Sequence, residues 1–215
     1  MPITLDTSLP PSLYPLAWLI GSWEGTGALS TADPDAPDAR IEQQLVCTAR
    51  EDGTMEWRST IHRVDAPAPL PPTSAFARDE PETSTAETSA AASSGERTLL
   101  HREDGIWTVG DLLPGQDREA AEAAAPGTAG SFLSHRLGAQ LTRRDAPTEE
   151  WIGEVRGPRV QLARGAADGA VAATRMFGYV SGRLMWLWEH RLPVPDGAPG
   201  ETALTPYLSL EMHRV

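Results

Sequence analysis

From residue 22 onward, apolar and polar residues alternate in ten short segments of this chain. A period of two residues is typical of β-strands that bury one face, and turn sequences such as EDGT, RGP and SGR separate several of the segments. We find no long amphipathic helical pattern between them, which argues against a parallel sheet with crossover helices. The sequence therefore predicts an all-β fold, a meander of ten antiparallel strands. The expected strands are 22–30, 40–49, 54–64, 98–108, 136–143, 149–156, 158–163, 171–180, 182–190 and 204–214.

The stretch GSWEGTG, residues 21–27, constrains the first strand further. Gly21, Gly25 and Gly27 share alternate positions with Trp23, so one face of this strand carries a single large side chain. Glycines in a strand permit the close approach of another backbone, a bulky residue or a ligand. We expect this strand to bend across one end of a closed up-and-down barrel of the calycin or lipocalin type, with Trp23 filling the end of the lumen. Prolines and apolar residues between 10 and 20 predict a short N-terminal helical turn that covers this end.

The length of 215 residues suits one barrel domain over residues 1–215. A formal net charge of −12 argues against nucleic acid and anionic membranes as partners, because both require a basic footprint.

The single cysteine, Cys47, excludes an internal disulfide and indicates a reducing compartment. The N-terminal residues lack both a basic region and a long apolar core. We therefore expect a cytoplasmic protein without a signal peptide or a transmembrane span.

Two segments do not fit a compact barrel. Residues 65–97 are rich in Pro, Ala, Ser, Thr and Glu and contain few large apolar side chains, so we expect a disordered insertion. Residues 114–131 have an Ala/Glu-rich centre that is long enough for one or two helical turns but has little to pack against. We expect this second segment to be a disordered surface insertion as well.

Five blocks of the chain resemble the nitrobindin family, in the order in which the family has them. The blocks are PLAWLIGSWEGTG, LLHREDGIW at 99–107, EEWIGEVRGPRVQLA at 149–163, ATRMFGYVSGRLMWLWEH at 173–190 and LTPYLSLEMHRV at 204–215. Nitrobindins are barrels similar to the fatty-acid-binding proteins, and many of them are actinobacterial. Family barrels are often dimeric, so a homodimer stays open, although the sequence reveals no apolar patch for an interface.

The resemblance implies a lumen that holds haem b, with the ferric iron on one histidine from the last strand. It also implies nitric oxide binding and the isomerisation of peroxynitrite to nitrate, for which one axial position of the iron stays open. The family's terminal block has a threonine, one variable residue, the haem histidine and a leucine. Here the block reads LTPYLS, with Tyr207 in the place of that histidine. Asp168, in an Ala/Gly-rich segment upstream, would also repel haem propionates.

We therefore expect a nitrobindin-like barrel, a ferric nitrobindin-like member of the family, that has lost the haem-ligating histidine. It would carry no cofactor, no catalytic residue and no metal, and it would bind a small apolar ligand or none. One alternative is a ferric haem enzyme in which Tyr207 or a displaced histidine holds the iron. A second alternative is a carrier of a fatty-acid-like ligand, which would need an inward arginine or tyrosine to hold the carboxylate.

The candidate pocket residues are Tyr207, His101, Trp186, Trp188 and His190. Alternation places both tryptophans and His190 on one strand face, either as plain core or as a pocket wall. We expect His101 to contact Glu103 at a strand end, and we interpret the other acidic residues as solvated. Tyr207 points outward with its hydroxyl in water unless a bulge near Pro206 reverses it.

No pair of the five histidines has metal-ligand spacing. Calycin barrels commonly stack a C-terminal arginine on the tryptophan of the first strand. We therefore expect Arg214 to close the barrel by a cation–π contact with Trp23.

Overall fold

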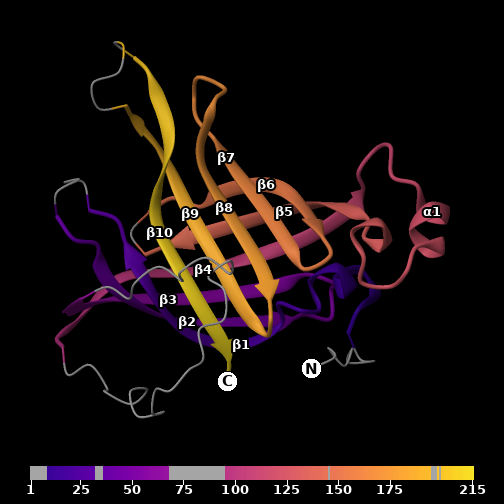
Figure 1. Ribbon diagram of the computed structural model, residues 1–215, viewed down its shortest axis with the longest axis horizontal. Helices are drawn as coiled ribbons and strands as arrows, with labels where there is room; N and C mark the ends of the chain where they lie inside the picture. The colour runs from indigo at the N-terminus through magenta and orange to yellow at the C-terminus, as the bar shows by residue number, and fades with distance from the viewer. Residues whose placement is uncertain (1–8, 32–35, 68–94, 145, 195–197, 199) are drawn as a thin grey trace, which may run out of the picture.

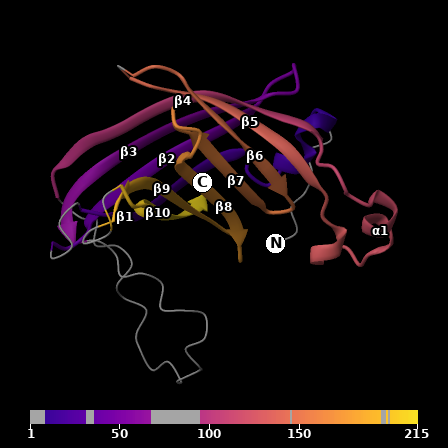
Figure 2. The same cartoon turned by 90° about the horizontal axis from the view of Figure 1, so that it is seen from above.

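The computed structural model of the protein describes residues 9–31, 36–67, 95–144, 146–194, 198 and 200–215. Ten strands form a closed barrel in which each strand is antiparallel to its neighbours along the chain and the first pairs with the last (Figures 1 and 2). The strands are β1 (Gly21–Leu29), β2 (Ala39–Ala49), β3 (Met55–Pro67), β4 (Arg97–Leu112), β5 (Ser134–Arg143), β6 (Glu149–Arg156), β7 (Arg159–Gly165), β8 (Val171–Val180), β9 (Arg183–Pro193) and β10 (Thr202–Arg214). The predicted up-and-down barrel is confirmed.

The two segments expected to be disordered have different outcomes. Strands β3 and β4 extend into the first segment, as far as Pro67 and from Arg97. Residues 68–94 of this segment lie outside the described residues. The second segment is described and contains α1 (Arg118–Ala123) and the 3-10 turn η2 (Ala129–Ser131). Helix α1 begins where the side chain of Asp117 accepts a hydrogen bond from the backbone N–H of Ala120 (2.9 Å). This cap and the helical turns replace the disorder that we expected there.

A short N-terminal 3-10 helix, η1 (Pro11–Leu16), covers one end of the barrel. Its Leu13 and Leu16 are fully buried and belong to the core. Pro11, at the first position of the helix, fixes the backbone there and removes an N–H group that would otherwise lack a partner. The expected helical turn is thus present, and it seals the base of the lumen by burying apolar side chains.

Trp23 and Arg214 close the same end. The Trp23 indole is fully buried, and its N–H donates to the carbonyl of Leu19 (2.8 Å). Arg214 lies over this indole, with Cζ 4.4 Å from the ring centroid, and it also donates to the carbonyls of Trp18 (2.8 Å) and Ile20. The expected cation–π pair therefore forms, and the same guanidinium ties the last strand to the segment before the first.

The glycines of β1 face the backbone of β10. A Cβ at Gly25 would overlap the carbonyl oxygen of Glu211, and a Cβ at Gly27 would overlap that of Ser209. Neither clash could be relieved by moving a side chain, because both contacts are with backbone atoms. The two glycines are therefore required where the barrel closes on itself.

Aromatic side chains fill the middle of the lumen. Trp57 stacks on Trp107 with their centroids 5.0 Å apart, and Phe177 stacks on Trp186 at 5.2 Å. Phe177 also contacts Trp57 and Trp107 edge-on, at 5.6 Å in each case. This interlocked cluster makes the centre of the barrel a packed core.

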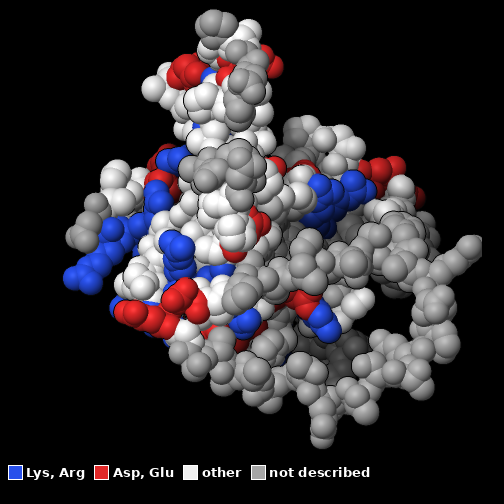
Figure 3. All heavy atoms as spheres, turned by 60° about the vertical axis from the view of Figure 1, so that its left-hand side comes forward, with Lys and Arg blue, Asp and Glu red and all other residues white. Residues whose placement is uncertain are grey.

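On the face shown in Figure 3, basic and acidic side chains occur in small neighbouring groups over the barrel. Ion pairs with exposed members include Arg183 with Glu211 and Arg97 with Glu42. Within the described part of the chain, none of the helices has the length and apolar character needed to cross a membrane.

Candidate functional site at the barrel mouth

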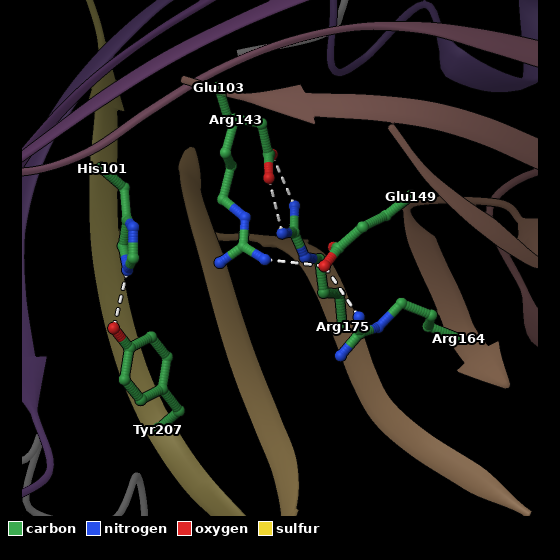
Figure 4. Close-up of polar contacts among 7 residues, drawn as sticks. All are labelled: His101, Glu103, Arg143, Glu149, Arg164, Arg175 and Tyr207. Carbon is green, nitrogen blue, oxygen red and sulfur yellow. Dashed lines mark hydrogen bonds and ion pairs between the residues drawn. The ribbon is translucent and has the colours of Figure 1, made fainter. Parts of the chain in front are cut away.

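At the end of the barrel opposite Trp23, the inward side chains change from apolar to polar. Figure 4 shows several of these polar side chains and the contacts between them. Strand β5 illustrates the change, because its buried Leu137, Ala139 and Leu141 are followed at the next inward position by Arg143. Six inward residues from six strands form this layer, which we call the mouth cluster: His101, Arg143, Glu149, Arg164, His190 and Tyr207. A closed barrel with a polar, charged mouth has the architecture of a small-molecule binding site.

Tyr207 belongs to the cluster because β10 is irregular at this point. The pairing of β10 with β9 shifts register between Pro206 and Leu208, so that Tyr207 has no partner in the register. The bulge lets the partly buried Tyr207 reach the lumen although the next residue, Leu208, is also directed inward and is fully buried. The Tyr207 hydroxyl lies 2.6 Å from His101 Nε2 on β4. Of the two orientations left open by the sequence, the structure therefore has the one that a bulge near Pro206 produces, and the hydroxyl contacts His101.

His190 completes an aromatic stack beside this pair. Its ring lies parallel to that of Tyr207, with the centroids 4.5 Å apart and an angle of 9° between the planes. Trp188 contacts both rings edge-on, at 5.0 Å from His190 and 5.2 Å from Tyr207. Three of the predicted pocket residues therefore meet His101 in one contiguous group, while Trp186 lies deeper, in the packed centre.

Glu149 holds two arginines at the other side of the mouth. Its Oε1 accepts from Arg143 Nη2 (2.6 Å) and from Arg164 Nη1 (2.7 Å). The Arg143 side chain is 27% exposed and that of Arg164 33%, whereas Glu149 is 11% exposed. The two guanidinium groups can therefore be reached from solvent at the rim, with their shared carboxylate more deeply placed between them.

A buried ion pair lies directly below the mouth cluster. Arg175 donates to both oxygens of Glu103, at 2.7 and 2.8 Å, and Trp57 Nε1 donates to Glu103 Oε1 (3.1 Å). The Arg175 guanidinium is also held between two indoles, 4.0 Å from the centroid of Trp188 and 4.5 Å from that of Trp151. Bidentate geometry and flanking rings are the conditions under which arginine tolerates burial.

Burial sets the protonation states of His101, His190 and Tyr207, which we call the aromatic group. Loss of solvent lowers the pKa of His101 below its ordinary value, and the nearby Arg143 lowers it further. The pKa of His190 is lowered by burial and then by Arg164 and Arg143. Burial raises the pKa of Tyr207, which Arg143 only partly opposes. At neutral pH, the group therefore consists of two neutral imidazoles and a protonated phenol.

The lowered pKa values of the two histidines predict an acid-sensitive mouth. Below the unfolded histidine value of about 6.5, the unfolded chain binds protons that the folded barrel resists, so stability decreases as the pH falls toward the lowered values. We expect the urea midpoint to fall between about pH 7 and 5.5, with a flatter slope in the variant carrying His101→Gln and His190→Gln. The exposed His213→Gln is the control and should keep the wild-type slope. Equal slopes in all three proteins would contradict this prediction.

The structure corrects three sequence-based expectations about acidic residues. Glu103 does not pair with His101 but with Arg175, and both members of that pair are buried. Glu149 is not a solvated surface residue, since it bridges two arginines of the mouth cluster. Asp168 lies outside the cluster, exposed on the turn between β7 and β8, where its carboxylate pairs with Arg191 (3.0 Å).

Three arginines of the site, Arg143, Arg164 and Arg175, were not predicted from the sequence. Each one occupies an inward position in a strand whose other inward residues are apolar, as Arg175 does between Ala173 and Phe177. This position in the strand alternation was the available signal. Among the residues that the structure describes, no three His, Cys, Asp or Glu side chains are grouped so that they could hold a metal ion.

A closed ten-stranded meander, sealed at one end by a tryptophan–arginine pair and polar at the other, defines the chain as a calycin-type barrel with its site at the open end. Residues 12–214 match the protein family described as "THAP4-like, heme-binding beta-barrel domain". The chain therefore belongs to this family, which is the nitrobindin family that its sequence blocks resemble.

Individual relatives agree with this assignment. The chain is 30% identical over 223 residues to a protein of Paenarthrobacter aurescens named peroxynitrite isomerase, with 100% of both chains covered. It is 31% identical over 195 residues to a ferric nitrobindin-like protein of Beutenbergia cavernae, covering 86% of this chain and 89% of that one. The crystal structure of Rv2717c from M. tuberculosis superposes with a TM-score of 0.52 at 18% identity, covering 97% of this chain and 99% of that one, and so shares the fold.

Proposed function

We propose that this chain is a haem-free member of its family, a barrel that binds a small molecule at the mouth cluster and does not isomerise peroxynitrite through a histidine-ligated haem. The observation that carries the proposal is the direct hydrogen bond of 2.6 Å between Tyr207 and His101. The resemblance of the terminal block LTPYLS to the family's pattern places Tyr207 at the position of the haem histidine. Two side chains at hydrogen-bond distance leave no room for an iron porphyrin between them.

The chemistry of the donor set supports the same proposal. A tyrosine ligates ferric haem as the tyrosinate, which requires the pKa of the phenol to be far below its ordinary value. The pKa of Tyr207 is instead raised by burial. The parallel contact of His190 with the Tyr207 ring occupies one face of the phenol as well. As arranged here, the mouth residues do not fit haem b.

One observation favours a second candidate, a ferric haem protein with Tyr207 as the axial ligand. Arg143 lies close enough to Tyr207 to lower its pKa, which is the assistance that a tyrosinate ligand needs. Relatives that cover the whole chain are named peroxynitrite isomerase. The two candidates differ in one measurable property, the affinity of the purified protein for hemin.

The test is a hemin titration followed by visible absorption. For the wild-type protein, we expect no sharp, stoichiometric Soret band. Such a band, lost in Tyr207→Phe, would overturn the proposal in favour of the tyrosine-ligated haem protein. A band in Tyr207→His alone would support the proposal and identify the ligand as the sole deficit. The control Tyr14→His places a histidine at an exposed position of η1, remote from the mouth, and reports adventitious hemin binding.

A further inference from the structure

The mouth of the barrel contains more hydrogen-bond donors than acceptors. Among the described residues, seven buried side-chain atoms in and directly below the mouth cluster have no hydrogen-bond partner. They are Arg143 Nε, Arg164 Nε, Arg175 Nε, Trp151 Nε1, Trp188 Nε1, Glu149 Oε2 and His190 Nε2. Five of the seven are N–H groups that can only donate. Trp151 and Trp188 are 1% and 2% exposed, so their indole N–H groups are fully withdrawn from bulk water.

Hydrogen bonds and ring contacts connect the residues that carry these atoms into one site. Glu149 joins Arg143 to Arg164, and Arg164 lies over the Trp151 ring at 5.7 Å. Trp151 contacts Trp188 edge-on at 6.3 Å, and Arg143 lies over Trp188 at 5.7 Å. Unpartnered buried donors are costly when they are isolated, and a group of them around one opening indicates an acceptor-rich ligand.

The charge of the site indicates an anion with a single charge. Three guanidinium groups, on Arg143, Arg164 and Arg175, face two carboxylates, on Glu103 and Glu149, while both imidazoles are neutral at pH 7. The excess is one positive charge. A monoanion would neutralise it, whereas a dianion would leave a buried charge uncompensated.

The geometry of the donors favours a carboxylate. Arg143 and Arg164 each give one nitrogen to the same oxygen of Glu149, which leaves their other N–H groups for a second acceptor. The guanidinium fork matches the two oxygens of a carboxylate. Both arginines are partly exposed, so a ligand can reach them from the rim.

The packing below the mouth limits the rest of the ligand. The lumen beneath is occupied by the interlocked rings of Trp57, Trp107, Phe177 and Trp186, which leave no path for a long alkyl chain. Partly exposed aromatic surface is instead presented at the mouth by Tyr207 and His190. A short or aromatic carbon frame can pack on these rings.

We propose that the mouth cluster binds a small organic monocarboxylate, with its carboxylate on Arg143 and Arg164 and its carbon frame against the aromatic group. The proposal rests on the proposed haem-free function and specifies its ligand class. Glu149 occupies the arginines in the free protein, and the incoming carboxylate competes with it for them. This competition predicts that substituting either arginine weakens ligand binding, whereas substituting Glu149 tightens it.

The experiment is a titration of the hemin-free protein with sodium benzoate, followed by tryptophan fluorescence and calorimetry. Benzamide, which has the same shape without the charge, is the matched ligand control. We expect saturable benzoate binding that is weakened roughly tenfold or more by Arg143→Gln or Arg164→Gln, because each removes charged hydrogen bonds. Glu149→Gln should tighten binding, because it removes the competing carboxylate. Arg183→Gln breaks an exposed ion pair on the outer surface and should leave benzoate affinity unchanged.

The arginine variants are expected to weaken benzoate binding and Glu149→Gln to tighten it. This difference keeps the test independent of folding defects, since a variant that only damages the barrel cannot tighten binding. The proposal is overturned if benzamide binds as well as benzoate, if both arginine variants keep wild-type affinity, or if Glu149→Gln weakens binding while folding normally by circular dichroism. Absence of benzoate binding would refute the ligand class and leave the hemin result standing. A stoichiometric Soret band in the wild type would refute the haem-free function whatever the benzoate result.

Discussion

Replacing Glu103 by alanine is expected to lower the free energy of unfolding by about 3–5 kcal/mol, because the change leaves a buried charge without its partner. The Arg175 side chain is 1% exposed and both of its terminal nitrogens donate to Glu103. Trp57 Nε1 would lose its acceptor as well. Urea denaturation followed by far-UV circular dichroism measures the effect.

A control and a double variant make this prediction specific. Glu150→Ala removes an exposed carboxylate of β6 and should change stability by less than about 0.5 kcal/mol. Glu103→Leu combined with Arg175→Met removes both charges and should recover much of the loss, since apolar replacements of a buried pair are often tolerated. If the double variant is no more stable than Glu103→Ala, the cost arises from packing and the electrostatic explanation is wrong.

Phe177→Ala is expected to destabilise the barrel by about 3–5 kcal/mol through the cavity it creates. The ring is fully buried and contacts three tryptophans at centroid distances of 5.2–5.6 Å. Those indoles come from β3, β4 and β9, so the gap cannot close without moving three strands. The urea midpoint measures the loss, and near-UV circular dichroism should report the changed indole environments.

Phe177→Leu serves as the comparison for this prediction, because it retains most of the apolar volume and should cost clearly less than the alanine variant. Equal losses for the two variants would show that the aromatic contacts, and not the filled volume, provide the stabilisation. A loss below about 1 kcal/mol for Phe177→Ala would mean that the lumen can collapse around the missing ring.

The barrel itself could be predicted because its signal is repeated along the chain. Strand alternation specifies which face is buried in every segment, and short turns specify antiparallel neighbours. The contact between Trp23 and Arg214 was predictable from the resemblance to calycin barrels, and the structure confirms it. Residues 114–131 were the exception, since helical capping by Asp117 gives order to a segment with little apolar surface.

The mouth cluster was only partly predictable. Tyr207, His101 and His190 were singled out individually, yet their contacts depend on a bulge in β10 that alternation does not reveal. The partners Glu103 and Arg175 are 72 residues apart, and only the register of the closed barrel brings them together. Charged residues at strand ends are usually solvated, so the alternation that places Arg143 on an inward face does not by itself distinguish it from a solvated residue.

The pairing of Trp23 with Arg214, where β1 meets β10, has a consequence for the nascent protein. The two strands that close the barrel are the first and the last of the ten along the chain, so the cylinder closes only after all ten strands have been synthesised. Until then two sheet edges remain available to other chains, and contacts of such high sequence separation form slowly. The interval before closure is when chaperones would protect these edges.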